Sequence, residues 1–257
     1  VELKAGWNAV FLHVDPSHES IAGTIGADPY NPITQVWRWS PPGTAQFFNS
    51  PQDTVFDLSG WVQWVRTDRN SALKNLAGDT AYLVESLTNH TWRVKGRPIA
   101  PRHFWNIGGL NLIGFPTVPA TPPKMEAFLA DANEMKSSDL EVYRYNGLSL
   151  SENNPQLMPS LLFRNLPVNR GQAFWMRAGD VFNEYFGPFE VLVPSDAGVA
   201  FGDTLNVSGI RLRNHSLREL TVSIALTPSE AAPAGQPTID ALPPLIVRGE
   251  RNENAMS

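Results

Sequence analysis

The chain of 257 residues is 42% hydrophobic and 18% charged, a balance that is typical of a folded protein with a sizeable core and excludes a disordered chain. Its formal net charge is −5 and its basic residues are scattered, so they form no patch that would neutralise nucleic-acid phosphates. Cysteine is absent, which excludes disulfides and zinc–thiolate sites, and no apolar run approaches the roughly 20 residues of a membrane-spanning helix.

The low charged fraction, together with 22 prolines and 19 glycines, predicts a mainly β fold with a few short helices. Residues 1–4 lead directly into a first strand. The chain starts at Val1 and not at an initiator methionine, and we interpret this start as a processed N-terminus or a fragment boundary. A processed start is consistent with removal of a signal peptide.

The segment 6–12 begins a diverged internal duplication. It reads Gly-Trp-Asn followed by an apolar run, and the segment 109–115, which lies 103 residues later, reads Gly-Leu-Asn followed by a second apolar run. Glycine and asparagine tolerate a positive φ angle, which suits a turn that leads into a buried strand. The apolar runs are short and rich in β-branched and aromatic residues, so we expect strands and not helices.

Two further blocks recur in the same order. Residues 36–39 (Val-Trp-Arg-Trp) correspond to residues 142–145 (Val-Tyr-Arg-Tyr), and residues 78–84 correspond to residues 171–176. Each copy then closes with another β-like stretch. We therefore predict two duplicated β modules, the first over residues 1–101 and the second over residues 102–194.

Each module is expected to contain a short helix between its first two blocks. In the second module Thr121 is the predicted N-cap, prolines occupy the first turn, and Met125, Phe128 and Leu129 fall on one helical face. The first module has only the shorter segment 16–22 at this place.

The aromatic residues of the second block form a pair on one side of the strand, because side chains alternate along a strand. The pair is Trp37 and Trp39 in the first module, and Tyr143 and Tyr145 in the second. One interpretation is a platform on which sugar rings stack, and the other is a buried face that packs against the helix of the module. Because the pair recurs in both copies, the buried face is favoured.

One aromatic group has no counterpart in the second module. Trp61 and Trp64 lie in a long irregular excursion between the second and third blocks of module one, close to Gln63 and Arg66. Tryptophan with polar neighbours suits stacking on a sugar or on a partner surface, so these four residues are the candidate ligand- or partner-binding residues. The alternative is that the two tryptophans close one end of the module.

The third segment, residues 195–257, is poor in aromatic residues and rich in small and β-branched ones. Alternating apolar residues over 204–213 and 220–226 predict a β-hairpin with one buried face. A complete immunoglobulin-like β-sandwich needs about seven strands and about 100 residues, so we expect an incomplete one. Either the chain continues beyond Ser257, or another copy supplies the missing strands to an open sheet edge.

No catalytic, metal or cofactor motif is recognisable. The five histidines lack the spacing of zinc sites, and His13 is expected to be a surface or hydrogen-bonded residue. Residues 147–151 lack the second glycine of a nucleophile elbow, and no glycine-rich phosphate loop is present. We therefore predict no catalytic residues, no metal ligands and no cofactor. Carboxylate pairs that are distant in the sequence leave a glycan-directed hydrolase open.

The recurring motifs resemble those of a group of uncharacterised secreted bacterial proteins with tandem Gly-Trp-Asn-type, aromatic-rich β modules. The resemblance covers nearly the whole chain and rests on residues 5–12, 36–37, 60–61, 81–84, 111–116, 171–175 and 187–188. It implies a secreted or cell-surface location and a modular polypeptide with further β domains. It brings no catalytic residues with it.

These features predict a non-catalytic extracellular protein and not an enzyme: a structural or interaction component of a cell surface, matrix or filament. Its expected partners are other copies of itself or other surface proteins, with polysaccharide as a further candidate and without nucleic acid or a membrane span. A carbohydrate-binding module or adhesin is the first alternative function, and a glycan-directed hydrolase is the second.

Overall fold

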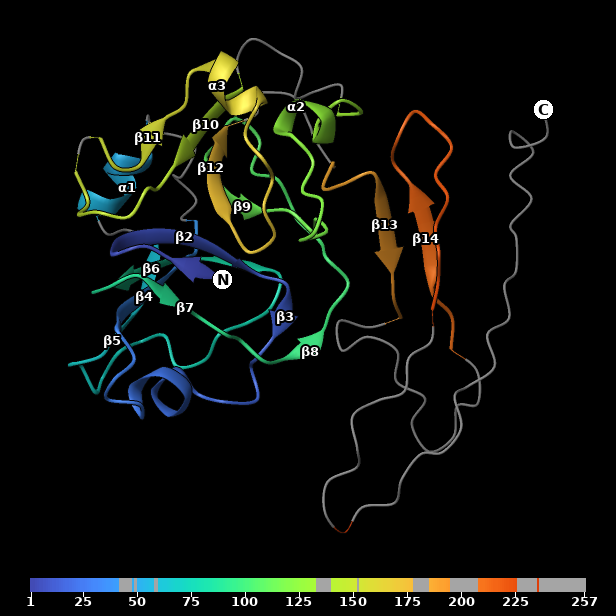
Figure 1. Ribbon diagram of the computed structural model, residues 1–257. Helices are drawn as coiled ribbons and strands as arrows, with labels where there is room; N and C mark the ends of the chain where they lie inside the picture. Colours follow the sequence, from blue (N-terminus) through green and yellow to red (C-terminus); the bar gives the residue numbers. More distant parts are fainter. Residues whose placement is uncertain are drawn as a thin grey trace. The chain divides into compact units, whose positions relative to one another are not determined.

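The computed structural model describes residues 1–41, 48, 50–57, 60–132, 140–151, 153–177, 185–194, 208–225 and 235. The chain divides into two units, Val1–Glu219 and Leu220–Ser257, and all the elements named below belong to the first (Figure 1). The described part is mainly β with short helices, which confirms the predicted fold class.

The strands are β1 (Glu2–Leu3), β2 (Gly6–Leu12), β3 (Val14–Asp15), β4 (Ile33–Trp39), β5 (Trp61–Val65), β6 (Thr80–Ser86), β7 (His90–Thr91), β8 (Arg97–Pro98), β9 (Asn111–Gly114), β10 (Glu141–Arg144), β11 (Gln156–Leu157), β12 (Ala173–Arg177), β13 (Phe189–Leu192) and β14 (Arg211–Asn214). The helical segments are the π-helical turn η1 (Ala22–Gly26) and the α-helices α1 (Pro51–Asp57), α2 (Met125–Phe128) and α3 (Ser160–Arg164).

Two antiparallel sheets of four strands form the centre of the part that the structure describes. The order is β2-β6-β4-β5 in the first sheet and β11-β10-β12-β9 in the second. Numbered along the chain within each sheet, both have the order first, fourth, second, third. The two sheets thus share one strand order, and the duplication stays a prediction. The strand order also corrects one expectation, because the excursion that carries Trp61 and Trp64 forms strand β5, with β11 at the corresponding place in the second sheet.

A recurring asparagine fixes the turn that leads into each first strand. The Asn8 Nδ2 donates hydrogen bonds to the carbonyl oxygens of Lys4 and Gly6 at 2.8 and 2.9 Å, and the Asn8 Oδ1 accepts the Lys4 N–H at 2.9 Å. Asn111 makes the same set, because its Nδ2 donates to Asn106 and Gly109 and its Oδ1 accepts the Asn106 N–H. Asparagine side chains suit this role because they offer a donor and an acceptor together.

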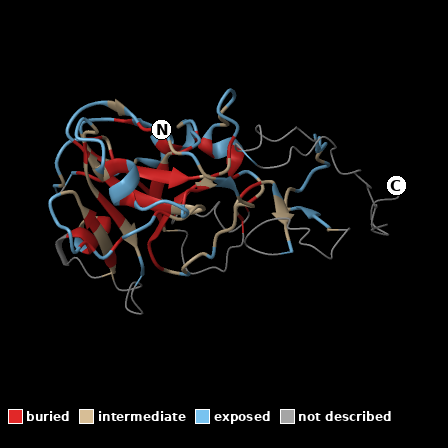
Figure 2. Ribbon diagram, turned by 90° about the horizontal axis from the view of Figure 1, so that it is seen from below, coloured by how far each residue is buried: buried red, intermediate tan, exposed pale blue. Residues whose placement is uncertain are grey.

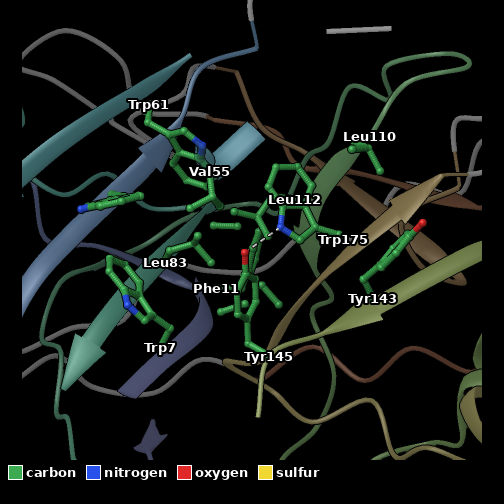
Figure 3. Close-up of a cluster of buried hydrophobic side chains, with 14 residues drawn as sticks. Trp7, Phe11, Val55, Trp61, Leu83, Leu110, Leu112, Tyr143, Tyr145 and Trp175 are labelled. Carbon is green, nitrogen blue, oxygen red and sulfur yellow. Dashed lines mark hydrogen bonds between the residues drawn. The ribbon is translucent and has the colours of Figure 1, made fainter. Parts of the chain in front are cut away.

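The two sheets pack face to face around a shared core (Figure 3). We call this group of buried side chains the shared cluster. Its aromatic members are Trp7, Phe11, Trp37, Trp61, Tyr143, Tyr145 and Trp175. Trp175 of β12 is fully buried, and its ring centroid lies 5.3 Å from that of Trp39 and 5.9 Å from that of Trp61. The Trp175 Nε1 donates to the Tyr145 hydroxyl at 3.4 Å, drawn as the dashed line in Figure 3.

The outer face of each sheet has its own core, so buried residues run through both sheets (Figure 2). Val36 of β4 packs with Ile21 and Ile25 at η1, and Val142 of β10 belongs to the cluster that includes α2 and α3. Trp37, Tyr143 and Tyr145 are therefore buried, as favoured, and Trp39 is partly buried, but these side chains belong to the cluster between the sheets. The expectation that they pack against the helix of their own module is wrong, because η1 and α2 cover the opposite faces.

The helix of the second module starts later than predicted. Met125, Phe128 and Leu129 are buried on one face, as expected, but the N-cap is Lys124 and not Thr121. Residues that precede a proline disfavour the α conformation, and two prolines follow Thr121. Lys124 is itself extended, and it forms a β-bridge with Pro167 that delays the first helical turn.

The predicted hairpin between residues 204–213 and 220–226, with one buried face, does not form among the described residues. Residues 195–207, 226–234 and 236–257 lie outside the described residues, and residues 221–225 are not in a strand. β14 pairs instead with β13, with Glu190 opposite Arg213 and Val191 opposite Leu212. The Pro188 carbonyl oxygen accepts the His215 N–H at 2.8 Å and closes this two-stranded ribbon. The ribbon crosses the predicted division after residue 194, and the module bounds stay a prediction.

Candidate functional site

Two of the candidate binding residues predicted from the sequence belong to the core. Trp61 has 8% of its surface exposed and lies in the shared cluster, where its Nε1 donates to the Thr54 carbonyl oxygen at 3.1 Å. Trp64 has 5% exposed and lies in the cluster on the η1 face. A ring stacks on a ligand only through an exposed face. The interpretation of Trp61 and Trp64 as a binding platform is therefore corrected, because both rings fill the interior around β5.

Arg66 and Gln63 contribute to the scaffold beside these rings. Arg66 donates hydrogen bonds to three carbonyl oxygens of the segment 25–33 at 2.9–3.1 Å, and its guanidinium lies 5.9 Å from the centroid of the Trp64 ring. The last carbonyls of a helical turn have no partner inside it, so Arg66 stabilises the end of η1. Gln63 is half-buried in β5, and its carbonyl oxygen accepts the Leu73 N–H at 2.9 Å.

The residues that the structure describes include no group of three or more His, Cys, Asp or Glu side chains placed to hold a metal ion. In the same part of the chain, no helix has the length and apolar character needed to cross a bilayer. Titratable side chains gather instead at a pocket between the two sheets.

The junction pocket has a volume of about 100 Å³ and lies where corresponding corners of the two sheets meet. Its wall includes residues that follow the first strand of each sheet and residues that precede the fourth strand of each sheet. The lining residues are His13, Asp79, Ile99, Pro101, Pro116 and Arg170. A second pocket, of about 80 Å³, shares Pro101 and Pro116 with it and includes His103, Glu190 and His215.

Asp79 is the carboxyl group of the junction pocket. Its Oδ2 accepts the N–H of Arg102, whereas its Oδ1 is buried without a hydrogen-bond partner among the described residues. Burial raises the pKa of Asp79 to about 7, against the opposing effects of the Arg102 N–H and the Arg102 charge. At neutral pH this carboxyl group is thus divided between its protonated and ionised forms. Its φ angle of 52° lies in a region that Asp and Asn adopt more readily than most residues.

His13 connects the two sheets at the same pocket. Its Nε2 accepts the Gly171 N–H at 3.0 Å, and its ring lies at the edge of the Phe11 ring, with centroids 4.8 Å apart. Burial, and then the Arg170 charge, lower the pKa of His13 to about 4, so the ring is neutral at pH 7. The expectation of a hydrogen-bonded histidine is confirmed. In the second pocket, burial similarly lowers the pKa of His103 to about 4.

The sequence carries a signal for this pocket. At the spacing of 103 residues His13 corresponds to Pro116, and in the third block Asp79 corresponds to Gln172. At both positions the titratable residue is absent from the corresponding place of the predicted second module. Sequence reasoning missed the pocket because His13 and Asp79 are far apart in the chain and neither belongs to a motif.

Comparison of the chain with protein-family models, with curated proteins and with solved structures gave no match. The resemblance to secreted bacterial proteins therefore stays a prediction. Function has to be argued from the junction pocket and from the exposed surface.

The buried carboxyl group makes stability depend on pH. The pKa of Asp79 is about 7 in the folded chain and 3.8 in a solvated one, so between these values the folded state holds a proton that the unfolded state releases. The contribution of protonated Asp79 to the free energy of unfolding of the wild type is therefore lost as pH rises from about 4 to about 7. Asp79→Asn keeps an acceptor for the Arg102 N–H and avoids the buried charge. We expect it to be more stable than wild type by about 2 kcal/mol at pH 8 and equal at pH 4, allowing for water at the pocket mouth.

Urea unfolding across this pH range measures the difference between wild type and Asp79→Asn. Glu126→Gln on the exposed side of α2 removes one negative charge elsewhere and serves as the control. A constant difference between Asp79→Asn and wild type at all pH values would contradict the buried-carboxyl explanation.

Proposed function

We propose that this protein is a non-catalytic interaction protein of the cell surface or extracellular matrix, which joins other copies of itself through the ribbon formed by β13 and β14. The supporting observation is that each strand of this sheet has one neighbour among the described residues, while the two central sheets have four strands each. An unpaired strand edge presents a row of backbone donors and acceptors, which a further strand can satisfy.

The ribbon has the surface that such an addition requires. Phe189 and Leu212, on one face of the ribbon, are 43% and 39% exposed, and Ile210 before β14 is 56% exposed. A two-stranded ribbon is only marginally stable in water, and it gains stability when further strands extend it. Extension by a second copy would cover these side chains and pair the edge of β13 that has no neighbour among the described residues.

Charge favours one arrangement of the copies. Within the chain the Glu190 Oε2 lies 3.2 Å from a guanidinium nitrogen of Arg213, which is directly opposite in the antiparallel register. When β13 of one copy lies beside β14 of the next in the same register, Glu190 again faces an arginine. This contact joins different surfaces of the two copies, so it continues from copy to copy and builds a filament, unless the rotation between copies closes it into a ring.

Opposite charge reversals test this contact. Glu190→Arg alone and Arg213→Glu alone each place like charges across the joint between identical copies, and we expect each variant to remain monomeric. An equimolar mixture restores opposite charges at every mixed joint although both internal pairs stay broken, so we expect the mixture to associate. Sedimentation velocity at increasing concentration measures the association, with wild type as the reference.

The mixture separates association from folding, because a variant that merely destabilised its own ribbon would gain nothing from the other. Arg93→Glu, at an exposed position outside the ribbon, is the control for net charge. Wild-type protein that stays monomeric at millimolar concentration would overturn the proposal.

The two alternative functions have less support. A carbohydrate-binding surface on Trp61 and Trp64 would need exposed rings, and both are buried. A retaining or inverting glycan hydrolase uses two carboxyl groups that flank the scissile bond. Burial raises the pKa of Asp79, and the described residues that line its pocket include no second carboxyl group.

A further inference from the structure

The junction pocket has a polar atom that the protein leaves unsatisfied. Asp79 Oδ1 faces no donor or acceptor among the described residues, although Asp79 Oδ2 is bound to the Arg102 N–H. A buried polar atom without a partner costs about 1–3 kcal/mol, and this cost is recovered when a bound molecule supplies the partner. Asp79 lines a pocket of about 100 Å³, so there is room for such a molecule.

The charges around this atom select the ligand. Arg170 lines the pocket, and the Arg102 charge acts on the Asp79 carboxyl group. His13, the other titratable residue in the wall, uses its Nε2 as an acceptor for Gly171 N–H and is neutral. While Asp79 is protonated, Arg170 is the charged side chain among the described lining residues, so the wall of the pocket is positive. A small anion is therefore favoured over a cation.

The apolar part of the pocket wall narrows the class of anionic ligand further. Ile99, Pro101 and Pro116 supply an apolar wall beside the polar groups. A carboxylate with a short carbon skeleton matches this combination, because its anionic end pairs with a guanidinium while its C–H groups contact the apolar wall.

We propose that the junction pocket binds a small carboxylate, with the Arg170 guanidinium pairing with the anion and the protonated Asp79 Oδ1 donating a hydrogen bond to it. The ligand is either a free hydroxy acid or the uronate unit of an acidic polysaccharide, which share this chemistry. The site does not involve the β13–β14 ribbon and stands independently of self-association.

The proposal predicts that binding and protonation are linked. Only protonated Asp79 donates through Oδ1, and ionised Asp79 repels the ligand. The charged and titratable neighbours are Arg102, Arg170 and His13, of which the arginines keep their charge across this range. His13 is neutral above about pH 4. The pKa of Asp79 is about 7, so wild-type affinity is expected to be about tenfold weaker at pH 8 than at pH 6.

Isothermal titration calorimetry of the full chain with lactate, galacturonate, a galacturonate oligomer and neutral galactose tests the proposal. Lactate binding as tight as galacturonate indicates a free hydroxy acid, and tighter binding of the galacturonates indicates a uronate unit. Galactose is expected not to bind. Absence of binding by all three carboxylates, or binding of galactose equal to that of galacturonate, would overturn the proposal.

Two variants separate the roles of the side chains. Asp79→Asn carries a permanent donor in place of the protonated carboxyl group, so it should bind at pH 8 as wild type binds at pH 6, without pH dependence. Arg170→Gln should lose tenfold or more in affinity at every pH, while Arg93→Gln at an exposed position elsewhere is unchanged. Wild-type binding of a carboxylate that strengthens as pH rises would contradict the assignment of protonated Asp79 as the hydrogen-bond donor.

Discussion

Trp175→Ala is expected to lower the free energy of unfolding by about 3–5 kcal/mol, the largest loss from any single side chain in this fold. Trp175 is fully buried in the second sheet and contacts Trp39 and Trp61 of the first. Truncation leaves a cavity at the place where the two sheets meet, and the rings around it lose their edge-to-face contacts. Because the cavity belongs to both sheets, both should lose stability together.

Urea unfolding followed by tryptophan fluorescence and by far-ultraviolet circular dichroism measures this effect. Trp175→Phe keeps a ring at the site and should lose less than half as much. Phe104→Ala removes a ring that is 90% exposed and should change little. Two separate transitions in the wild-type protein, with only one of them shifted by Trp175→Ala, would show that the sheets unfold independently and would refute the shared core.

Gly6→Ala is expected to cost about 3 kcal/mol, although it adds one methyl group. Gly6 has a φ angle of 94°, a conformation that is strained for any residue with a Cβ atom. The added methyl group would also overlap the backbone of Leu148, which lies in the second module. That backbone is fixed to the first module by Trp7 N–H to Leu148 C=O at 2.9 Å and Leu148 N–H to Ala5 C=O at 2.8 Å. Neither the Gly6 turn nor the Leu148 backbone can move away at low energetic cost, so the backbone strain at Gly6 and the steric overlap with Leu148 add together.

Gly209→Ala is the matched control for this substitution, because a Cβ atom there meets nothing within 4 Å. Its expected effect is within about 0.5 kcal/mol. Thermal unfolding monitored by circular dichroism compares the two variants. Equal midpoints for Gly6→Ala and Gly209→Ala would contradict the close approach of the two modules at this turn.

Much of the fold could be predicted from local patterns. The Gly-Trp-Asn and Gly-Leu-Asn blocks predict β2 and β9, because turn residues and a short apolar run specify a buried strand without reference to the rest of the chain. Met125, Phe128 and Leu129 predict a helical face for the same reason. Burial of the paired aromatic residues follows from their recurrence in both copies.

Features that depend on contacts between residues distant in the sequence could not be predicted from local patterns. Alternation places Trp37 and Trp39 on one face, but it does not say whether a helix or a second sheet covers that face. The segment 61–65 reads as an irregular excursion because its pairing with β4 is a contact between distant residues. The choice of β13 as partner for β14 likewise depends on the match of Glu190 with Arg213 across about twenty residues.

The junction pocket is the least predictable feature. Its residues come from positions 13 to 170 and meet only because two sheets of the same order place their corresponding corners together. The sequence does contain the difference between Asp79 and Gln172 at corresponding positions of the two predicted modules. The raised pKa of Asp79 comes from burial, and burial arises only when the chain has folded.

The shared cluster between the sheets also constrains which substitutions the two halves of the chain can accept. Tryptophans in β4 face tyrosines in β10 across a common interior, so the meeting surfaces are complementary in volume and not identical. A larger ring on one side has to be matched by a smaller one on the other. We infer that substitutions in the two sheets are coupled across this cluster, so the effect of a core change in one sheet depends on the residues that pack against it from the other.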